Sequence, residues 1–365
     1  MEAKLTAQAR MSASSTTVRE SKLLAAARGG EELAFGRLVE PHRAELHAHC
    51  YRMLGSVHDA DDALQDALLR AWRGLEKFER RSSLRTWLYR ITTNASLDVI
   101  SRRPKRVLPV DHGQAAGPGD ALADPLTESV WVEPYPDQQL GLEDGYAGPE
   151  ARYERRESVE LAFIAALQHL PGTQRAALIL RDVLGFSARE AADALETTVP
   201  SVNGALRRAR TAVAQRLPDQ TQQANLRALG DDRIRELVER YTDAWERGDV
   251  DAILAMLADD ATFTMPPLPT WYRGRDAIAE FLVRYALQDR WRLLATRANG
   301  QLAFGCYAWD ANQACYTALS LDVLMLDGTR ATAVTSFVTP HTRGPARARF
   351  AADVFERFGL PTRLD

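Results

Sequence analysis

A stretch without basic residues divides the chain. Between Val107 and Glu150 there is no Lys or Arg, whereas nine Asp and Glu residues occur there among many Gly and Pro. The stretch has neither a helical nor a strand period, which predicts a linker over residues 108–150. The segment before it, from Arg70 to Arg106, carries 11 Lys and Arg against three acidic residues. This order indicates a polyanion-binding surface beside a segment that could compete for it.

The bulk composition indicates a soluble protein with more than one domain. A chain of 365 residues is expected to form two or three domains, and 45% hydrophobic with 26% charged residues is typical of globular proteins. No apolar run approaches the roughly 18 residues that a membrane span needs, and the N-terminus lacks the order of a signal peptide. Three scattered cysteines, Cys50, Cys306 and Cys315, fit a reducing compartment. We therefore expect a cytoplasmic protein without a membrane partner.

Helical periodicity on both sides of the linker predicts two all-helical domains. Residues 30–107 form the first, preceded by a tail over 1–29 that includes the start of its first helix, and residues 151–218 form the second. Residues 228–362 follow a different pattern, with helices and five β-rich runs, which is typical of an α+β domain. The expected fold class is multi-domain, with two all-α domains followed by an α+β domain.

The second helical domain contains the spacing of a helix-turn-helix. Ser187–Leu195 predicts a short amphipathic helix capped by Ser187, and a second helix is expected to begin after its cap Thr198. In this motif the second helix lies in the major groove, where Asn suits adenine and Arg suits guanine. The residues expected to face DNA are Ser201, Asn203, Gly204, Arg207 and Arg208. On these residues alone, a plain helical hairpin with a solvated arginine face is the alternative.

Three segments resemble the sigma-70 family of RNA polymerase subunits. Gly185–Arg210 resembles region 4, which reads the −35 promoter element. Asp59–Trp72 resembles region 2.2, which docks on a coiled coil of the polymerase β′ subunit, and Phe78–Arg103 resembles regions 2.3 and 2.4, which open and read the −10 element. The absence of a third sigma domain between them is typical of the extracytoplasmic-function group. The resemblance implies a non-catalytic subunit that binds core polymerase, through its β′ and β subunits, and promoter DNA.

The resemblance also implies roles for individual residues. The residues expected to contact core polymerase are Asp59, Asp62, Gln65 and Asp66. Those expected at the −10 element are Arg85, Asn94, Arg102 and Arg103. Asn94 would capture an unpaired base, and Lys105 and Arg106 would join Arg102 and Arg103 in holding backbone phosphates. No catalytic residue, cofactor or metal is expected.

The third domain resembles the SnoaL-like, nuclear-transport-factor-like α+β cone, through Tyr241–Asp249, Leu257–Met265 and Trp271–Ile278. Some members of that family are enzymes with acid–base residues on the inner wall of the cone. The residues expected to line the cone here are largely apolar: Trp245, Phe263, Met265, Trp271, Tyr307 and Trp309. They favour a ligand pocket or a protein-binding cone over an active site.

A sigma factor with such a tail resembles the actinobacterial SigG-like, SigJ-related type, in which the tail tunes activity by activating or inhibiting. The linker string Trp131–Asp137 resembles the linker motif of the SigG-like type and is a candidate dock for the tail; alternatively, a Pro-rich aromatic string only orders the linker. Two other functions stay open from the residues. One is a ligand-sensing helix-turn-helix regulator that binds duplex DNA alone, and the other is a SnoaL-like enzyme with a DNA-binding appendage.

A loose group of histidines raises the question of a metal site. The group consists of His42, His47, His49, Cys50 and His58. Zinc needs a tetrahedral set of ligands with closed spacing, which this group lacks. We therefore expect partly buried histidines rather than metal ligands.

Overall fold

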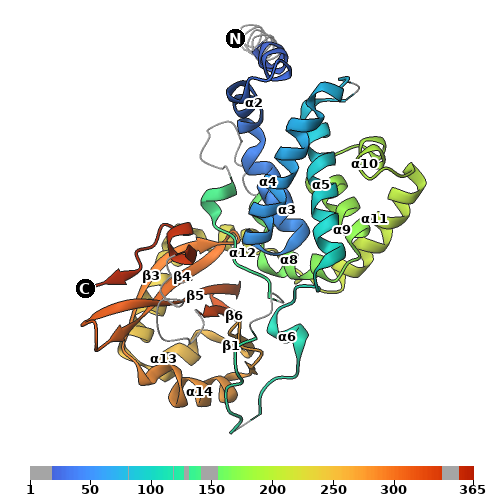
Figure 1. Cartoon of the computed structure of the whole chain (residues 1–365). Coiled ribbons are helices and arrows are strands. Elements are labelled where there is room, and N and C mark those ends of the chain that lie inside the picture. The colour runs from blue at the N-terminus through green and yellow to red at the C-terminus, as the bar shows by residue number, and fades with distance from the viewer. Residues whose placement is uncertain (1–18, 81, 118, 127–130, 141–154, 339–352) are drawn as a thin grey trace, which may run out of the picture.

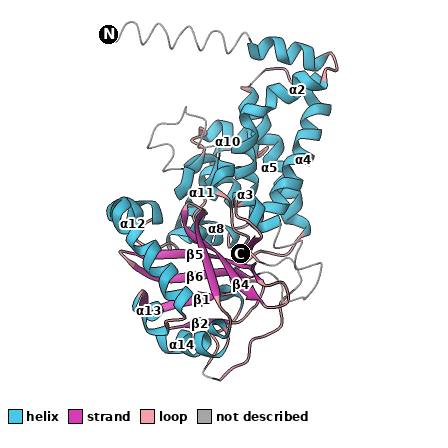
Figure 2. Cartoon of the chain, turned by 90° about the vertical axis from the view of Figure 1, so that its left-hand side faces the viewer, coloured by secondary structure: helices cyan, strands magenta, loops and turns pink. Residues whose placement is uncertain are grey.

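The computed structural model describes residues 19–80, 82–117, 119–126, 131–140, 155–338 and 353–365. The helices of the two N-terminal domains form one end of the molecule, and the sheet of the C-terminal domain forms the other (Figures 1 and 2). None of the helices in the described ranges combines the length and the apolar character that crossing a membrane requires.

The first helical domain is built on three long helices. These are α3 (Arg43–Leu54), α4 (Val57–Gly74) and α5 (Leu84–Arg102), which follow helical residues 19–28 and the short helix α2 (Glu32–Val39). Helix α3 ends at Gly55, whose φ of 69° suits a glycine, and Ser56 then caps α4 by accepting the Asp59 N–H. Leu46 and Leu88 are buried between the helices. The tight Gly55–Ser56 turn therefore sets α4 antiparallel to α3.

The second helical domain packs directly on the first. Its helices are α8 (Leu161–Gln168), α9 (Gly172–Leu178), α10 (Ala188–Ala194) and α11 (Val199–Ala214), and a π-helical turn (Ile179–Val183) extends α9. Helix α10 contacts α5, and one hydrophobic core runs through both domains. The two helical domains therefore form one packed body in this conformation.

The C-terminal domain is a curved sheet (Figure 2). Helices α12 (Gln222–Arg247), α13 (Val250–Ala255) and α14 (Arg275–Arg284) cover one face, and a short helical segment over residues 353–357 packs on the other through Phe355. The strands of the sheet are β1 (Leu257–Thr264), β2 (Trp271–Arg273), β3 (Trp291–Ala298), β4 (Gln301–Asp310), β5 (Cys315–Asp327), β6 (Arg330–Val338) and β7 (Arg363–Leu364). The sheet order is β2-β1-β6-β5-β4-β3, with β7 paired to β5; β1 and β6 run parallel and the other pairs antiparallel.

The two faces of the sheet serve different cores. Along β4, Phe304 and Cys306 pack with the domain's own helices, whereas Ala303 and Tyr307 belong to the core that contains the two helical domains. This alternation follows from the two-residue period of a strand. Because both faces are covered by protein, β4 is buried along almost its whole length.

The linker is bound along its described part. After α6 (Pro109–His112) it follows the edge of the C-terminal domain, where the Ala116 N–H donates to the Trp271 carbonyl (2.8 Å) and the Leu126 N–H to the Pro267 carbonyl (3.0 Å). Residues 131–140 then pass between α3 and the sheet. The described part of the predicted linker is therefore an irregular segment that contacts both the C-terminal domain and the first helical domain.

Candidate polymerase and promoter interface

The helix-turn-helix consists of α10 and α11, and both begin at the predicted caps. Ser187 and Glu190 form a capping box: the Glu190 N–H donates to Ser187 Oγ (3.2 Å), and the Ser187 N–H donates to the Glu190 carboxylate (2.9 Å). Thr198 Oγ1 accepts the Ser201 N–H (3.3 Å) at the start of α11. These caps fix the turn between the helices and hence the direction of α11.

One side of α11 is buried and the other is free for contacts. Val202 and Leu206 are buried in the domain core. The exposed residues include Ser201, Asn203, Arg207 and Arg208. Gly204 is half-buried, and a methyl group there would lie 3.5 Å from the Arg208 guanidinium. The five residues expected to face DNA thus lie together on one helix, as their spacing predicted.

Three of the four residues expected to face polymerase lie on one exposed side of α4. These residues are Asp62, Gln65 and Asp66. Asp66 pairs with Arg70 one turn later (2.7 Å), and Arg70 also pairs with Asp98 of α5 (2.7 Å). The acidic side of α4 is therefore neutralised at one end and open at Asp62.

Asp59, the fourth residue, is buried with only 4% of its surface exposed. It pairs with Arg103 and accepts two hydrogen bonds from Arg106, the shorter of 2.7 Å. Arg106 is also buried and donates to the Trp131 carbonyl (2.7 Å). In this conformation Arg106 is therefore not accessible to a DNA phosphate, and its predicted role stays a prediction. The sequence predicts that Arg106 follows the helix now seen as α5, but the helical spacing does not predict that the linker covers this residue.

The remaining candidates for the −10 element lie along α5. Arg85 is half-buried and donates to the Glu45 carboxylate (3.0 Å), which also contacts His42 (2.8 Å). Burial acts to raise the pKa of Glu45, but the hydrogen bond to His42 and the charge of Arg85 outweigh it, so the pKa is lowered. Asn94 is half-buried in the middle of the helix, and Arg102 is exposed at its end.

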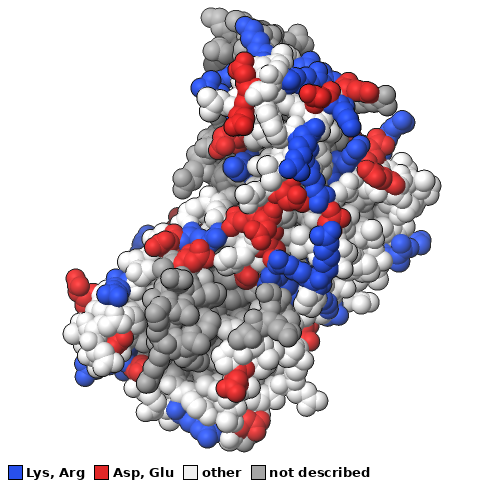
Figure 3. Space-filling model, in the orientation of Figure 1, with Lys and Arg blue, Asp and Glu red and all other residues white. Residues whose placement is uncertain are grey.

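The helix-turn-helix contacts α5, the helix that carries the −10 candidates, through α10 and its flanking residues. Phe186, just before α10, packs edge-on against Tyr89 of α5, with ring centroids 5.4 Å apart. The Arg85 guanidinium lies over both rings. Arg90 of α5 pairs with Glu196 in the turn of the helix-turn-helix (3.8 Å). On the face shown in Figure 3, Lys and Arg lie mostly over the helical half, beside acidic side chains near its boundary with the C-terminal domain.

One hairpin of the C-terminal domain contacts the other parts of the chain. Asn299 and Gly300, with φ of 56° and 70°, form the turn between β3 and β4. Asn299 is fully buried, and it exchanges two 2.8 Å hydrogen bonds with the Tyr135 backbone of the linker. Its Nδ2 donates to the Tyr51 hydroxyl of α3 (2.8 Å) and to the Val159 carbonyl before α8 (2.7 Å). Asn299 thus connects the turn between β3 and β4 to the linker, to α3 and to the segment before α8.

Of the two alternatives for Trp131–Asp137, the structure shows the contact with the C-terminal domain. Besides the Tyr135 bonds, the Asp137 carboxylate accepts the Gly300 N–H (2.7 Å). Tyr135 is fully buried, and its hydroxyl lies 2.8 Å from His47 Nδ1 of α3. Burial raises the pKa of Asp137 and of the Tyr135 phenol. Residues 131–137 therefore supply a buried aromatic ring and a carboxylate to the place where the linker, the first helical domain and the C-terminal domain meet, which we call the junction.

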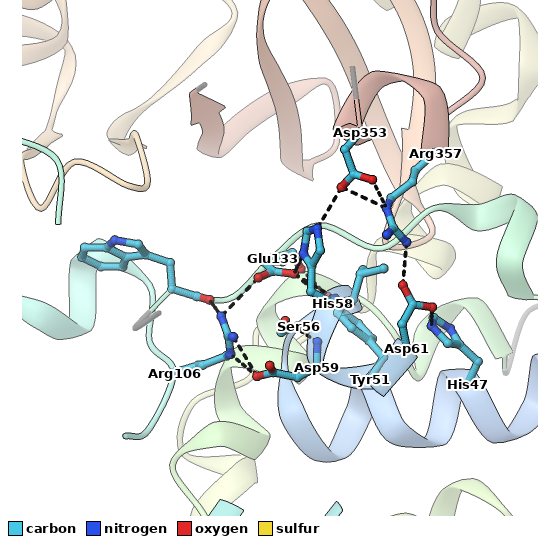
Figure 4. A network of polar contacts seen from close by, with 12 residues as sticks. His47, Tyr51, Ser56, His58, Asp59, Asp61, Arg106, Glu133, Asp353 and Arg357 are labelled. Carbon is cyan, nitrogen blue, oxygen red and sulfur yellow. Dashed lines mark hydrogen bonds and ion pairs between the residues drawn. The ribbon is translucent and has the colours of Figure 1, made fainter. Parts of the chain in front are cut away.

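Glu133 ties the linker to the start of α4 (Figure 4). Its carboxylate accepts the Val57 N–H (2.9 Å), contacts His58 Nδ1 (2.9 Å) and pairs with Arg106 (3.3 Å). The other ring nitrogen of His58 lies 2.8 Å from Asp353 near the C-terminus. Hydrogen bonding to Glu133 is the main cause that raises the pKa of His58 to about 9. The raised pKa favours the charged form of His58, which lies between a carboxylate of the linker and one of the C-terminal domain.

A second ion pair lies one turn further along α4. Asp61 accepts a hydrogen bond from Arg357 (2.9 Å) and contacts His47 Nε2 (3.0 Å), and Arg357 also pairs with Asp353 (3.3 Å). Sequence reasoning missed Asp61, Asn299 and the role of Glu133. An Asn-Gly pair between two β-rich runs does predict a tight hairpin, but the neighbouring sequence does not indicate which residues the hairpin contacts.

The six residues expected to line the cone are distributed over the C-terminal domain. Three are buried in the packed core between its helices and the sheet: Trp245, Phe263 and Met265. Tyr307 is buried on the opposite face of the sheet. Trp271 is buried, and its Nε1 donates to the Gly113 carbonyl of the linker (3.0 Å), whereas Trp309 is 36% exposed. The arrangement gives them packing roles rather than a shared pocket.

The histidines and cysteine grouped in the sequence take separate partners. His42 contacts Glu45, while buried His49 bonds the Thr93 hydroxyl (2.9 Å), and burial lowers the pKa of His49 to about 3. Cys50 is fully buried, and the two remaining histidines contact the carboxylates described above. Within the described ranges, no group of His, Cys, Asp and Glu could hold a metal ion.

Comparison with known proteins matches each part of the chain. Residues 38–106 match Sigma-70 region 2, residues 160–213 match Sigma-70, region 4, and residues 238–357 match the SnoaL-like domain. The ECF RNA polymerase sigma factor SigG of Mycobacterium tuberculosis is 38% identical over 335 residues, which span 90% of this chain and 85% of that protein. The chain belongs to the extracytoplasmic-function (ECF) group of sigma-70 factors. The predicted family and fold class are thereby confirmed.

Two further relatives show how far this ECF sigma factor resembles known members. The crystal structure of the ECF sigma factor SigJ of M. tuberculosis shares the fold, with a TM-score of 0.50 at 20% identity over 82% of this chain and 94% of that one. The ECF sigma factor SigM of the same species is 32% identical over 198 residues, 54% of this chain and 84% of SigM.

The His58 contact predicts a pH-dependent junction. Because the pKa of His58 is raised from 6.5 to about 9, its charge should stabilise the junction fully below about pH 6.5 and cease to do so as the pH rises through about 9. The difference in thermal midpoint between the natural chain and His58→Asn should therefore be largest near pH 6 and vanish near pH 10, as measured by differential scanning fluorimetry. Asp353→Asn, which leaves Glu133 in place, should shrink this pH dependence without removing it. A difference that is constant with pH contradicts the assignment.

Proposed function

We propose that this ECF sigma factor brings core RNA polymerase to promoters through its two helical domains. We further propose that the linker and the C-terminal domain hold those domains in a closed, inactive arrangement. The family matches and the identity with SigG support the first part. The second part rests on one observation, the buried contact of Asn299 with α3, the linker and the segment before α8.

The closed arrangement is too short for a promoter. Elements at −35 and −10 lie about 25 base pairs apart, or about 85 Å along B-DNA at 3.4 Å per base pair. In this arrangement α10 packs directly on α5, and one hydrophobic core runs through both helical domains, so the helix-turn-helix is held against the helix that carries the −10 candidates. The two DNA-reading surfaces therefore do not span both elements in this arrangement. The two helical domains must separate before the promoter is read.

The C-terminal domain also contacts α4 beside the proposed polymerase-docking side. Asp61 pairs with Arg357, and it directly precedes Asp62, the most open of the acidic residues proposed to meet the β′ coiled coil. His58, one turn earlier, contacts Asp353. A polymerase subunit that approaches this side of α4 would compete with the C-terminal segment, so docking on core and opening of the junction are coupled.

Replacement of Asp62 by Lys tests the docking side. Reversing this exposed charge should weaken binding to core polymerase about tenfold or more, because like charges would then face each other at the interface. The measurement is a fluorescence-anisotropy titration of the labelled chain with core enzyme. The matched control is Asp232→Lys on α12, whose carboxylate is 96% exposed in the C-terminal domain. Equal affinity of both variants would remove Asp62 from the interface.

Replacement of Arg207 by Ala tests the −35 surface. A guanidinium that contacts a base edge contributes about 1–3 kcal/mol, so promoter binding by the holoenzyme should fall roughly 5- to 150-fold. Electrophoretic mobility shifts with a promoter and with a copy altered only at −35 give this number, and the variant should discriminate the two less well. Arg240→Ala on α12 is the control, since Arg240 is exposed outside the helix-turn-helix. Undiminished discrimination argues against the assignment.

Replacement of Asn299 by Asp tests the closed arrangement. The new carboxylate loses the Nδ2 donor and faces the Val159 carbonyl, which should cost about 1–3 kcal/mol in this buried site. The measurement is run-off transcription by core polymerase, which should require addition of the sigma chain. The variant should give about fivefold more transcript than the natural chain, or more. The control Asn312→Asp makes the same change in the exposed turn between β4 and β5. Unchanged or reduced transcription from Asn299→Asp would contradict an inhibitory closed form.

A further inference from the structure

A cavity of about 340 Å³ lies where three parts of the chain meet. The first helical domain contributes Val57 and His58 at the start of α4, the linker contributes Trp131 and Pro134, and the C-terminal domain contributes Phe337 among others. The volume lies within the range of about 300–1,000 Å³ that is typical of small-molecule sites. No single domain forms the cavity, which is absent from any arrangement in which the three parts separate.

The lining of the cavity is mostly apolar, with aromatic rings and prolines on the linker and C-terminal walls. Its charged residues already have partners: Arg106 pairs with Asp59 and Glu133, and Arg357 pairs with Asp61. A charged ligand would have to separate one of these pairs in a poorly solvated place. An uncharged apolar ligand would displace only water from apolar walls.

We propose that this junction cavity binds an uncharged, apolar small molecule with at least one ring, and that the bound molecule holds the sigma factor closed. The second half of this inference rests on the proposed function of the junction. A ligand that binds one of two conformations shifts the population toward that conformation by its difference in affinity. Because the open chain has no such cavity, occupancy favours the closed chain, and the C-terminal domain becomes the sensor of an apolar repressing signal.

The neutral dye N-phenyl-1-naphthylamine, which fluoresces in apolar surroundings, is a suitable probe of the cavity. Val354 is half-buried in its wall, so Val354→Phe should fill part of the space and weaken dye binding to the full-length chain at least tenfold. The control Val283→Phe adds the same atoms on α14 at a position that is 56% exposed, and it should bind the dye as the natural chain does. Undiminished binding to Val354→Phe overturns the site.

Hydrogen exchange of the natural chain then tests the coupling without any variant. The Tyr135 N–H donates to Asn299 Oδ1, and the Asn299 N–H donates to the Tyr135 carbonyl. Both amides exchange only when the junction opens, so their exchange rates report that opening. At dye concentrations ten times the Kd, exchange in peptides that contain these amides should slow about tenfold. Unchanged or faster exchange at saturation overturns the proposal that the ligand holds the chain closed.

The outcome is independent of sigma activity. Neither the dye titration nor the exchange measurement contains polymerase or promoter, so a chain that failed to support transcription would refute the proposed function without altering these two results. Conversely, a chain that supports transcription but binds no dye in the cavity refutes the ligand site alone.

Discussion

The polar contacts between the parts of the chain converge on the buried side chain of Asn299. Its amide and backbone make four hydrogen bonds, to the linker, to α3 and to the segment before α8, at a point that has no access to water. Buried polar groups that lose their partners are costly, so the hairpin is stable in this position only while all of these segments are present together. The position of the C-terminal domain is thereby linked to the relative position of the two helical domains.

Electrostatics reinforce this geometry. The sequence places basic residues at the end of α5 and acidic residues in the linker, and the fold brings them into contact. Arg103 and Arg106, near the proposed −10 surface, pair with Asp59, and Arg106 also pairs with Glu133 of the linker. Residues proposed to hold DNA phosphates are thus partly occupied by the chain's own carboxylates. Opening the junction would return part of this positive charge to the DNA-facing side, so release and promoter binding favour each other.

Local features of the fold could be predicted from sequence, whereas contacts between domains could not. Caps such as Ser187 and Thr198 act within one turn of a helix, and helical spacing alone defines which side of α11 is exposed. Asp59 has the same spacing as its exposed neighbours on α4, yet it is buried because the residues after α5 and the linker cover it. Likewise, the apolar residues Trp245 and Met265 read equally well as pocket lining or as core, since periodicity does not distinguish a cavity wall from packing.

The central claim is that the two helical domains are held together in the free chain and separate on the promoter. Spin labels on the exposed residues Leu33 of α2 and Ala214 at the end of α11, with Cys315 replaced by Ser, measure this separation by double electron–electron resonance. The free chain should give one narrow distance that lengthens by tens of ångströms, on the order of the spacing between the promoter elements, when core polymerase and promoter are added. The same distance with and without polymerase and DNA would contradict the account.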